Sequence, residues 1–225
     1  MKQVISIAEE NRKKRRVLMK KYFLLTVLAV VTMGLFGGCS NNDDTSDSSA
    51  SQSSSSSEMK ADNADQVMQD FDSITLGDAE NKGEGGTAKT EVEQFFGKVS
   101  EEDKGKAKEI TTDVITWDKP AGAKSIVISF IDDKVVGKSI DGLETADEKE
   151  LSKAQFGDLK TDGSYTKQMA LEQLGKPEGI GANRDSDGMV EIYNWNNVTD
   201  ENKKVITTIE FVDGNAKTKN QTDRE

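Results

Sequence analysis

The feature that most constrains the fold of this chain is an internal duplication. Four sequence blocks of the first half recur in the same order in the second half, at offsets of 85, 78, 78 and 81 residues. The matched blocks are Phe71–Ile74 with Phe156–Leu159, Val92–Lys98 with Ala170–Lys176, Asp113–Trp117 with Glu191–Trp195, and Ile126–Asp133 with Thr207–Gly214. Because such self-similarity indicates a repeated structural unit, it predicts two similar units in tandem.

Each block has the periodicity of one type of secondary structure. Val92, Phe95 and Phe96 share one helical face, and Gly97 follows where a helix C-cap favours a left-handed residue. The blocks that contain or follow each tryptophan alternate in the manner of strands. The Asp-Asp and Asp-Gly pairs that end the last blocks predict tight turns between antiparallel strands.

A further short helix is expected before each copy, around Val67–Phe71 and at Thr145–Glu148, where Thr-x-x-Glu matches a capping box. The predicted fold class is therefore α+β, with two tandem units of two helices followed by three antiparallel strands. We place these units at residues 67–143 and 144–225. Helices would cover one face of each sheet, and the other faces could lie side by side as one open, curved surface.

The N-terminal segment resembles a bacterial lipoprotein signal. Lys20 and Lys21 precede an apolar run, and small residues lead to Cys39, which is the single cysteine. We expect residues 1–38 to be removed and Cys39 to receive a diacylglyceryl group and a fatty acid such as palmitate. The expected location is the outer face of the cell membrane. An uncleaved anchor and a plain secretory signal are the alternatives, and translation could begin at Met19.

The segment after Cys39 predicts a tether. Ten of the 18 residues from Ser40 to Ser57 are serine, so we assign residues 39–66 to a disordered linker. The leader holds 8 of the 30 basic and 2 of the 41 acidic residues, which leaves a net charge of −17 in the remainder. Such acidity argues against nucleic-acid binding, because a nucleic-acid interface needs a basic patch.

Catalytic chemistry finds little support in the residue types present. The chain has no histidine, its one cysteine is the expected lipid site, and its carboxylates are scattered in polar segments. The sequence therefore predicts a protein that is not an enzyme and needs no cofactor. Asn183, Asp185 and Asp187 match the start of a calcium loop, but the twelfth position is Asn194 instead of an acid. A polar connection without metal is the preferred interpretation.

Aromatic residues and one turn are the candidates for a binding surface. Trp117, Tyr165, Tyr193 and Trp195 belong to the residue types that dominate protein interfaces. The preferred interpretation of the tryptophans, which occupy equivalent positions of the repeat, is that they pack in the core beneath the helices. The Asp213–Gly214 turn could instead protrude and fill a cleft of a partner.

The chain is similar to the tandem-repeat lipoproteins of Gram-positive bacteria related to β-lactamase inhibitory protein, and more distantly to small outer-membrane assembly lipoproteins of the SmpA/OmlA type. The residues that carry this resemblance include Phe71-x-x-Ile74, Gly85-Gly86-Thr87, Trp117, Leu174-Gly175-Lys176-Pro177, Tyr193-x-Trp195 and Lys219-x-Gln221. The resemblance implies an α+β fold and a non-enzymatic, lipid-anchored protein that binds another protein. An inhibitor or sensor of a secreted hydrolase and a passive envelope component are the alternatives.

Overall fold

The structure is a computed structural model that describes residues 55–107, 110–185 and 188–224. The chain divides into two compact units, residues 1–51 with 106–111 and residues 52–105 with 112–225. The second unit contains nearly all of the described residues, and the fold below is the fold of that unit. The leader, Cys39 and the tether as far as residue 54 lie outside the described residues.

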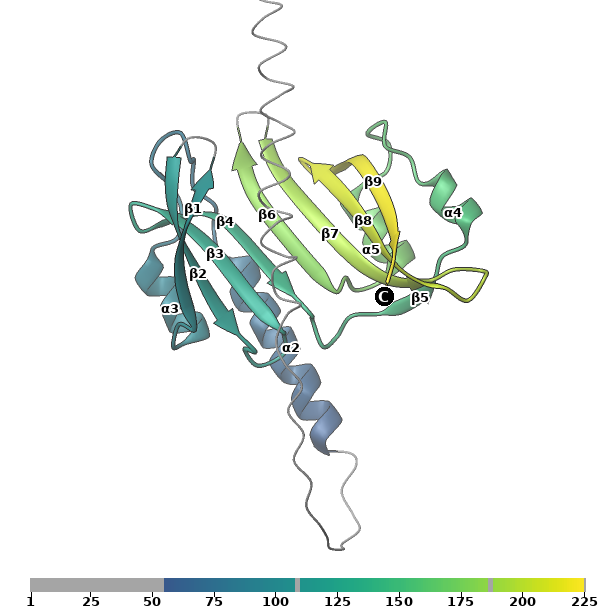
Figure 1. Cartoon of the computed structure of the whole chain (residues 1–225), viewed down its shortest axis with the longest axis horizontal. Helices are drawn as coiled ribbons and strands as arrows, with labels where there is room; N and C mark the ends of the chain where they lie inside the picture. Colours follow the sequence, from purple (N-terminus) through teal and green to yellow (C-terminus); the bar gives the residue numbers. More distant parts are fainter. Residues whose placement is uncertain (1–54, 108–109, 186–187, 225) are drawn as a thin grey trace, which may run out of the picture. The chain divides into compact units, whose positions relative to one another are not determined.

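The second unit is built on one mixed sheet in which strands from both halves of the sequence are paired (Figure 1). The strands are β1 (Glu101–Ala107), β2 (Ile110–Asp118), β3 (Ser125–Ile131), β4 (Lys134–Asp141), β5 (Glu148–Glu150), β6 (Gly179–Asp185), β7 (Gly188–Val198), β8 (Lys204–Val212) and β9 (Asn215–Asp223). Their order is β1-β2-β3-β4-β6-β7-β8-β9, and β5 pairs with β7 in parallel. Because β4 pairs with β6, the two predicted sheets form one continuous sheet.

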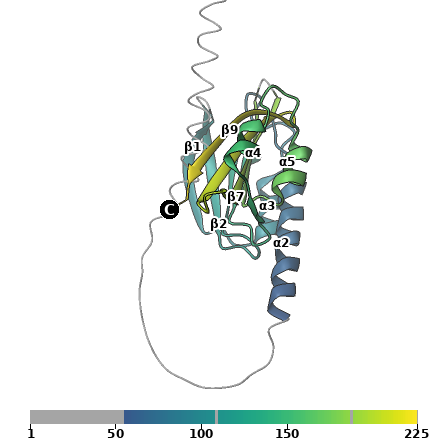
Figure 2. The ribbon, with the colours of Figure 1, turned by 90° about the vertical axis from the view of Figure 1, so that its right-hand side faces the viewer.

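The helices pack on one face of this sheet. They are α2 (Ser55–Ser73), α3 (Lys89–Phe96), α4 (Lys153–Asp158) and α5 (Lys167–Leu174). Figure 2 shows α2, α3 and α5 along the same side of the strands. The register aligns one helix-facing row across β2, β3, β4, β6, β7, β8 and β9, namely Trp117, Ile126, Ile140, Ile180, Tyr193, Ile209 and Lys219. The apolar members of this row and the buried helix residues form a single core.

The expected turns and helix ends are confirmed. Asp132 and Asp133 have φ of 47° and 60°, and Asp213 and Gly214 have φ of 49° and 76°. Both turns therefore have positive φ at both central residues, as a two-residue hairpin of type I′ requires. The Gly97 and Gly175 N–H groups donate to the carbonyls of Glu93 and Leu171, so both glycines cap helices.

The first helix is longer than expected, because α2 begins at Ser55, inside the range assigned to the tether. Its apolar stripe reaches further toward the N-terminus than the sequence pattern suggested, since Ala64 is fully buried together with Val67 and Phe71. A Cβ placed on Gly122 would lie 2.4 Å from the Ala64 Cα, so the backbones of α2 and this loop are in close contact. Because the contact is made by an alanine and a glycine, the hydrophobic pattern of the sequence does not reveal that this part of the helix is buried.

The helix expected at Thr145–Glu148 is wrong. Glu148 begins strand β5, whose three residues pair with residues 196–198 of β7. The capping box lies four residues beyond Glu148, where the Ser152 hydroxyl accepts from Gln155 N at 3.2 Å and Gln155 Oε1 accepts from Ser152 N at 2.9 Å. This capping box begins α4. A capping box was therefore correctly expected before the second copy, but it lies at Ser152 instead of Thr145.

The three-strand composition of each predicted unit is also wrong. β1 precedes β2 and β6 precedes β7, so four neighbouring strands follow the helices in each half. β1 reads Glu-Glu-Asp-Lys-Gly-Lys-Ala and β6 reads Gly-Ile-Gly-Ala-Asn-Arg-Asp. Neither strand has the alternating, β-branched pattern by which strands are usually recognised. Residues 183–188, which include the end of β6, were expected to be a polar connection.

Candidate functional site

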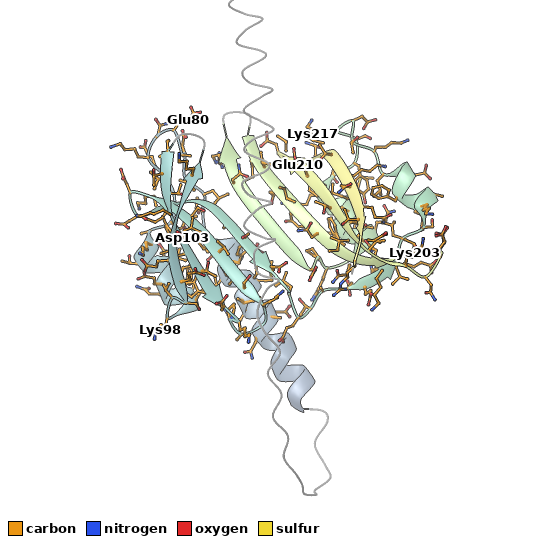
Figure 3. All side chains as sticks on the ribbon, viewed as in Figure 1. Glu80, Lys98, Asp103, Lys203, Glu210 and Lys217 are labelled. Carbon is orange, nitrogen blue, oxygen red and sulfur yellow. The ribbon has the colours of Figure 1, made fainter. Side chains whose placement is uncertain are left out.

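The face of the sheet that points away from the helices is the candidate site, and we call it the open face. Two register rows define it. The first runs Thr116, Val127, Ser139, Gly181, Ile192, Glu210 and Thr218, and the second runs Val114, Ser129, Gly137, Asn183, Val190 and Val212. Figure 3 marks Glu210 of the first row on β8. Within the described ranges, the open face carries mostly small, hydroxyl and β-branched side chains.

The middle of the open face carries small residues at the join between the two halves, namely Gly137 and Ser139 of β4 and Gly181 of β6, which we call the bare strip. Gly179, at one end of this strip, is covered, because a Cβ there would lie 3.2 Å from Asp141 Oδ1 and 3.6 Å from Asn194 Nδ2. A glycine inside a strand often marks a site where another molecule approaches the backbone closely. This strip can therefore receive a bulky side chain of a partner.

An acidic pair lies at one end of the strip. Burial raises the pKa of Asp141, and burial together with the negative charge of Asp141 raises the pKa of Glu178. Lys124 opposes both shifts, whereas Arg224 and a hydrogen bond from Asn196 oppose only the shift of Glu178. Two carboxylates that are poorly solvated and close to each other favour a neighbouring positive charge.

The four aromatic candidates do not form a surface. Trp195 is 0% exposed, Trp117 2%, Tyr165 6% and Tyr193 7%. Burial raises the pKa of the Tyr165 hydroxyl to about 12, and this hydroxyl lies 3.0 Å from Gln173 Oε1, to which it donates. All four rings pack in the core between the sheet and the helices. The interpretation that the tryptophans pack beneath the helices is confirmed, and none of the four rings is exposed to a partner.

The tryptophans instead join each sheet half to the end of a helix. Trp117 Nε1 donates to the Gly97 carbonyl at 3.1 Å, and Trp195 Nε1 donates to the Gly175 carbonyl at 2.9 Å. Both carbonyls belong to the glycines that cap α3 and α5. A buried indole N–H needs an acceptor, and the unpaired carbonyls at a helix end supply one.

Two lysines have structural roles that the sequence did not reveal. Lys138 Nζ donates to the carbonyls of Phe71 and Ile74 at 2.7 and 2.9 Å, and lies 4.6 Å from the centre of the Phe71 ring. Lys219 Nζ donates in the same way to three carbonyls at the end of α4 and lies 4.8 Å from the centre of the Phe156 ring. Lys219 is one of the residues that carry the family resemblance. Its contact with α4 could not be predicted, because a lysine in a strand is usually expected to be exposed to solvent.

A second charged group lies on the helix-facing side. Lys167 Nζ donates to both carboxylate oxygens of Glu191, at 2.9 and 2.8 Å, and lies 5.8 Å from the centre of the Tyr193 ring. Burial raises the pKa of Asp72, although Lys138 and Lys167 lower it. Lys167 and Glu191 satisfy each other between α5 and the sheet, so they belong to the packing rather than to the open face.

The calcium-like segment is a β-hairpin instead of the expected polar connection. Asn183 and Asp185 lie on β6, where they pair with Val190 and Gly188 of β7. Asp187 lies outside the described residues. In the described part of the chain, no group of three or more acidic, cysteine or histidine side chains is arranged to hold a metal ion. A strand directs successive side chains to opposite faces, which differs from the convergent oxygens of a calcium loop.

The Asp213–Gly214 turn is held against neighbouring elements. Asp213 N donates to the Met189 carbonyl at 2.9 Å, and Asp213 Oδ1 accepts from Met189 N at 2.9 Å. The Gly214 carbonyl accepts from Lys167 N at the start of α5, at 2.8 Å. The turn is therefore a fixed part of the scaffold, which makes it a weak candidate for a cleft-filling tip.

The comparison with solved structures supports the fold. The chain resembles the crystal structure, at 1.40 Å resolution, of a candidate beta-lactamase inhibitor protein from Streptococcus mutans. The two sequences are 25% identical and the TM-score is 0.55, over 71% of this chain and 97% of the other. An inhibitor protein is not an enzyme, and this likeness indicates no class of enzyme. No curated protein matches the chain in sequence.

Among the described helices, none is both long enough and apolar enough to cross a membrane.

A family model matches residues 62–224, a range that begins within α2 and includes every strand of the sheet. Its description is a domain of unknown function with a solved structure, DUF3862. Since this match covers well over half of the sequence, the chain belongs to the DUF3862 family.

Proposed function

We propose that this protein binds another protein through the open face of its sheet. The observation that carries the proposal is the one-sided layering, in which helices pack on one face of a continuous sheet and no described helix packs on the other. The bare strip at Gly137 and Gly181 gives a partner access to the backbone at the centre of this face. The resemblance to a candidate inhibitor protein supports a binding role, because an inhibitor acts by contact with its target.

The partner is expected to present a basic group to the acidic end of the strip. Asp141 and Glu178 are close enough for their charges to raise the pKa of Glu178. A cationic side chain that docks there would stabilise the ionised form of both carboxylates. The strong negative charge of the chain also speeds association with a basic surface at low salt.

The binding face is tested by Ser139→Arg, which places a long charged side chain on the bare strip. Met169→Arg is the matched control, because Met169 is 46% exposed on α5, on the helix side. We expect the tagged wild-type chain and Met169→Arg to recover the same partner from envelope extracts, and Ser139→Arg to lose it. Equal recovery by both variants, with both folded by circular dichroism, would rule out the open face.

The location of the protein is part of the proposal. Cys39 follows a segment that resembles a lipoprotein signal, so we infer that two or more acyl chains attach the protein to the outer face of the membrane. Cells grown with a clickable fatty acid should label the wild-type chain and leave Cys39→Ser unlabelled. Label on both chains, or on neither, would contradict the lipid attachment.

Inhibition of a secreted hydrolase is the second candidate function, and the name of the structural relative favours it. The assay is inhibition of a panel of β-lactamases by the purified full-length chain, with Ser139→Arg as the binding-defective control. Inhibition that disappears in Ser139→Arg would place the active surface on the open face. Absence of inhibition would leave a binding role without inhibition.

We also infer that the two halves arose by duplication. The support is the recurrence of unusual contacts at aligned positions, Trp117 and Trp195 on helix-end carbonyls and Lys138 and Lys219 on the ends of α2 and α4. The register shifts of the two hairpins, after Ser129 in β3 and after Glu210 in β8, also match at an offset of 81 residues. A shared bulge position is a feature that related strands retain.

A further inference from the structure

Strand β9 forms one edge of the sheet and is only partly covered. Its first residues are paired on their outer side, since Ala216 N donates to the Tyr165 carbonyl at 2.9 Å and Asn215 forms a bridge with Thr166. Beyond Ala216, β9 pairs with β8 alone among the described strands. The uncovered edge therefore runs from Lys217 to Asp223, and Figure 2 views the sheet from this edge.

This uncovered edge is accessible. Two features oppose pairing there, namely the lysines at 217 and 219 and a register shift that leaves Lys217 without a register partner on β8. Lys217, Thr218, Asn220, Thr222 and Asp223 are exposed. The segment contains no proline and no glycine. A long, exposed edge strand offers unpaired backbone donors and acceptors to another strand.

The opposite edge of the sheet is different. β1 carries five charged side chains in its seven residues, namely Glu101, Glu102, Asp103, Lys104 and Lys106. Dense charge is a common way in which proteins protect an edge from pairing. Figure 3 shows Asp103 on β1 and Lys217 on β9, at the two ends of the strand order. The contrast indicates that β9 is the edge available for association.

The sequence of the uncovered edge is complementary to itself. An antiparallel pairing of two copies about a two-fold axis at Asn220 sets Lys217 opposite Asp223 and Thr218 opposite Thr222. Opposite charges and threonine pairs that face each other across strands are both favourable. Among the described residues, no ion pair within 4.0 Å joins Lys217 or Asp223 to a residue of its own chain, and the interaction of Asp223 with Lys153 is a longer-range one.

We propose that β9 pairs with β9 of a second copy, antiparallel about this two-fold axis, so that two sheets join into one. The contact is isologous, and a closed two-fold dimer is the commonest form of homo-oligomer. The pairing uses the edge of the sheet, so it leaves the open face unobstructed and does not depend on the function proposed above.

Charge exchange tests the pairing through the mass of the full-length chain in mild detergent, measured by light scattering. Wild type is expected to be a dimer at micromolar to millimolar concentration. Lys217→Asp and Asp223→Lys each create two like-charge contacts per dimer and should weaken dimerisation about tenfold. The double variant Lys217→Asp/Asp223→Lys restores opposite charges and should restore the dimer. A wild-type monomer at millimolar concentration, or a double variant as weak as either single variant, overturns the proposal.

Cysteine crosslinking tests the position of the axis. In a Cys39→Ser background, Asn220→Cys places the only thiol on the axis, directly opposite its own copy. Thr222→Cys is the matched control, because its copy would lie four residues away along the strand, or about 14 Å. We expect rapid disulfide formation for Asn220→Cys alone. Equal crosslinking of both variants, or of neither, would overturn this pairing.

Discussion

Lys138 illustrates how a single residue can join the two layers of this fold. Its ammonium group donates to two carbonyls at the end of α2, where the last carbonyls of a helix have no partner within the helix. Its stem lies in a row with Ala182 and Glu191, in the middle of the sheet. Burial lowers the pKa of Lys138, and the nearby Asp72 carboxylate opposes that shift.

Lys138→Met should reduce the free energy of unfolding by about 2–3 kcal/mol, because it removes two charge-assisted hydrogen bonds and a cation–π contact while keeping the apolar stem. Lys134→Met, an exposed lysine on the same strand, is the control and should change it by less than about 0.5 kcal/mol. Urea denaturation monitored by tryptophan fluorescence measures both. Equal effects would show that Lys138 does not stabilise the helix end.

Glu178 provides a pH-dependent prediction. Burial raises its pKa in the folded state, so the folded protein binds this proton more tightly than the unfolded chain does. Stability is therefore lost as pH rises from the unfolded pKa through the raised folded pKa of Glu178. Glu178→Gln removes the charge and should raise the free energy of unfolding at pH 7, with a gain that shrinks toward pH 3.

Glu144→Gln is the control for this measurement, because Glu144 is an exposed carboxylate on the adjoining loop. Denaturation across the pH range should show no comparable gain for it. A Glu178→Gln gain that is constant with pH would mean that the substitution acts through packing and not through ionisation.

At the scale of elements, the two matching hairpins differ at the second central residue of the turn, where the backbone conformation favours glycine. The first turn places Asp133 at φ 60°, and the second places Gly214 at φ 76°. Only glycine adopts this region without steric strain. Asp133→Gly should therefore stabilise the protein by about 0.5–1 kcal/mol, and Gly214→Ala should destabilise it by about 1 kcal/mol.

Chemical denaturation of the two variants checks this pair. A Cβ on Gly214 would meet no atom within 4 Å, so the expected loss comes from the backbone alone. Opposite signs for the two substitutions support type I′ geometry in both turns. A stabilised Gly214→Ala variant would contradict it.

Elements with strong local signals could be predicted from the sequence, and elements held by tertiary contacts could not. The helix at Val92–Phe96 and the Asp213–Gly214 turn carry apolar spacing and turn chemistry of their own. Strand β6 carries neither, because it is held by β4 and β7 on its two sides. The capping-box pattern at Thr145 does not begin a helix, because the residues from Glu148 form strand β5 and pair with β7.

At the scale of the whole molecule, the sequence predicted a candidate face but not the residues on it. The alternation that identified Trp117 and Trp195 as strand residues is the same on either face of a sheet, so it could not distinguish core from surface. Their burial follows from helices that pack on that face, a tertiary feature. The bare strip arises only where β4 meets β6, more than 35 residues apart in sequence.

The central claim, that the open face is where a protein partner binds, is tested most directly by photocrosslinking in living cells. A photoreactive amino acid at position 139 lies on the bare strip, and the same amino acid at Met169 lies on the helix side. The account predicts a specific crosslinked protein from position 139 and none from position 169. A specific crosslink from position 169 alone would contradict it.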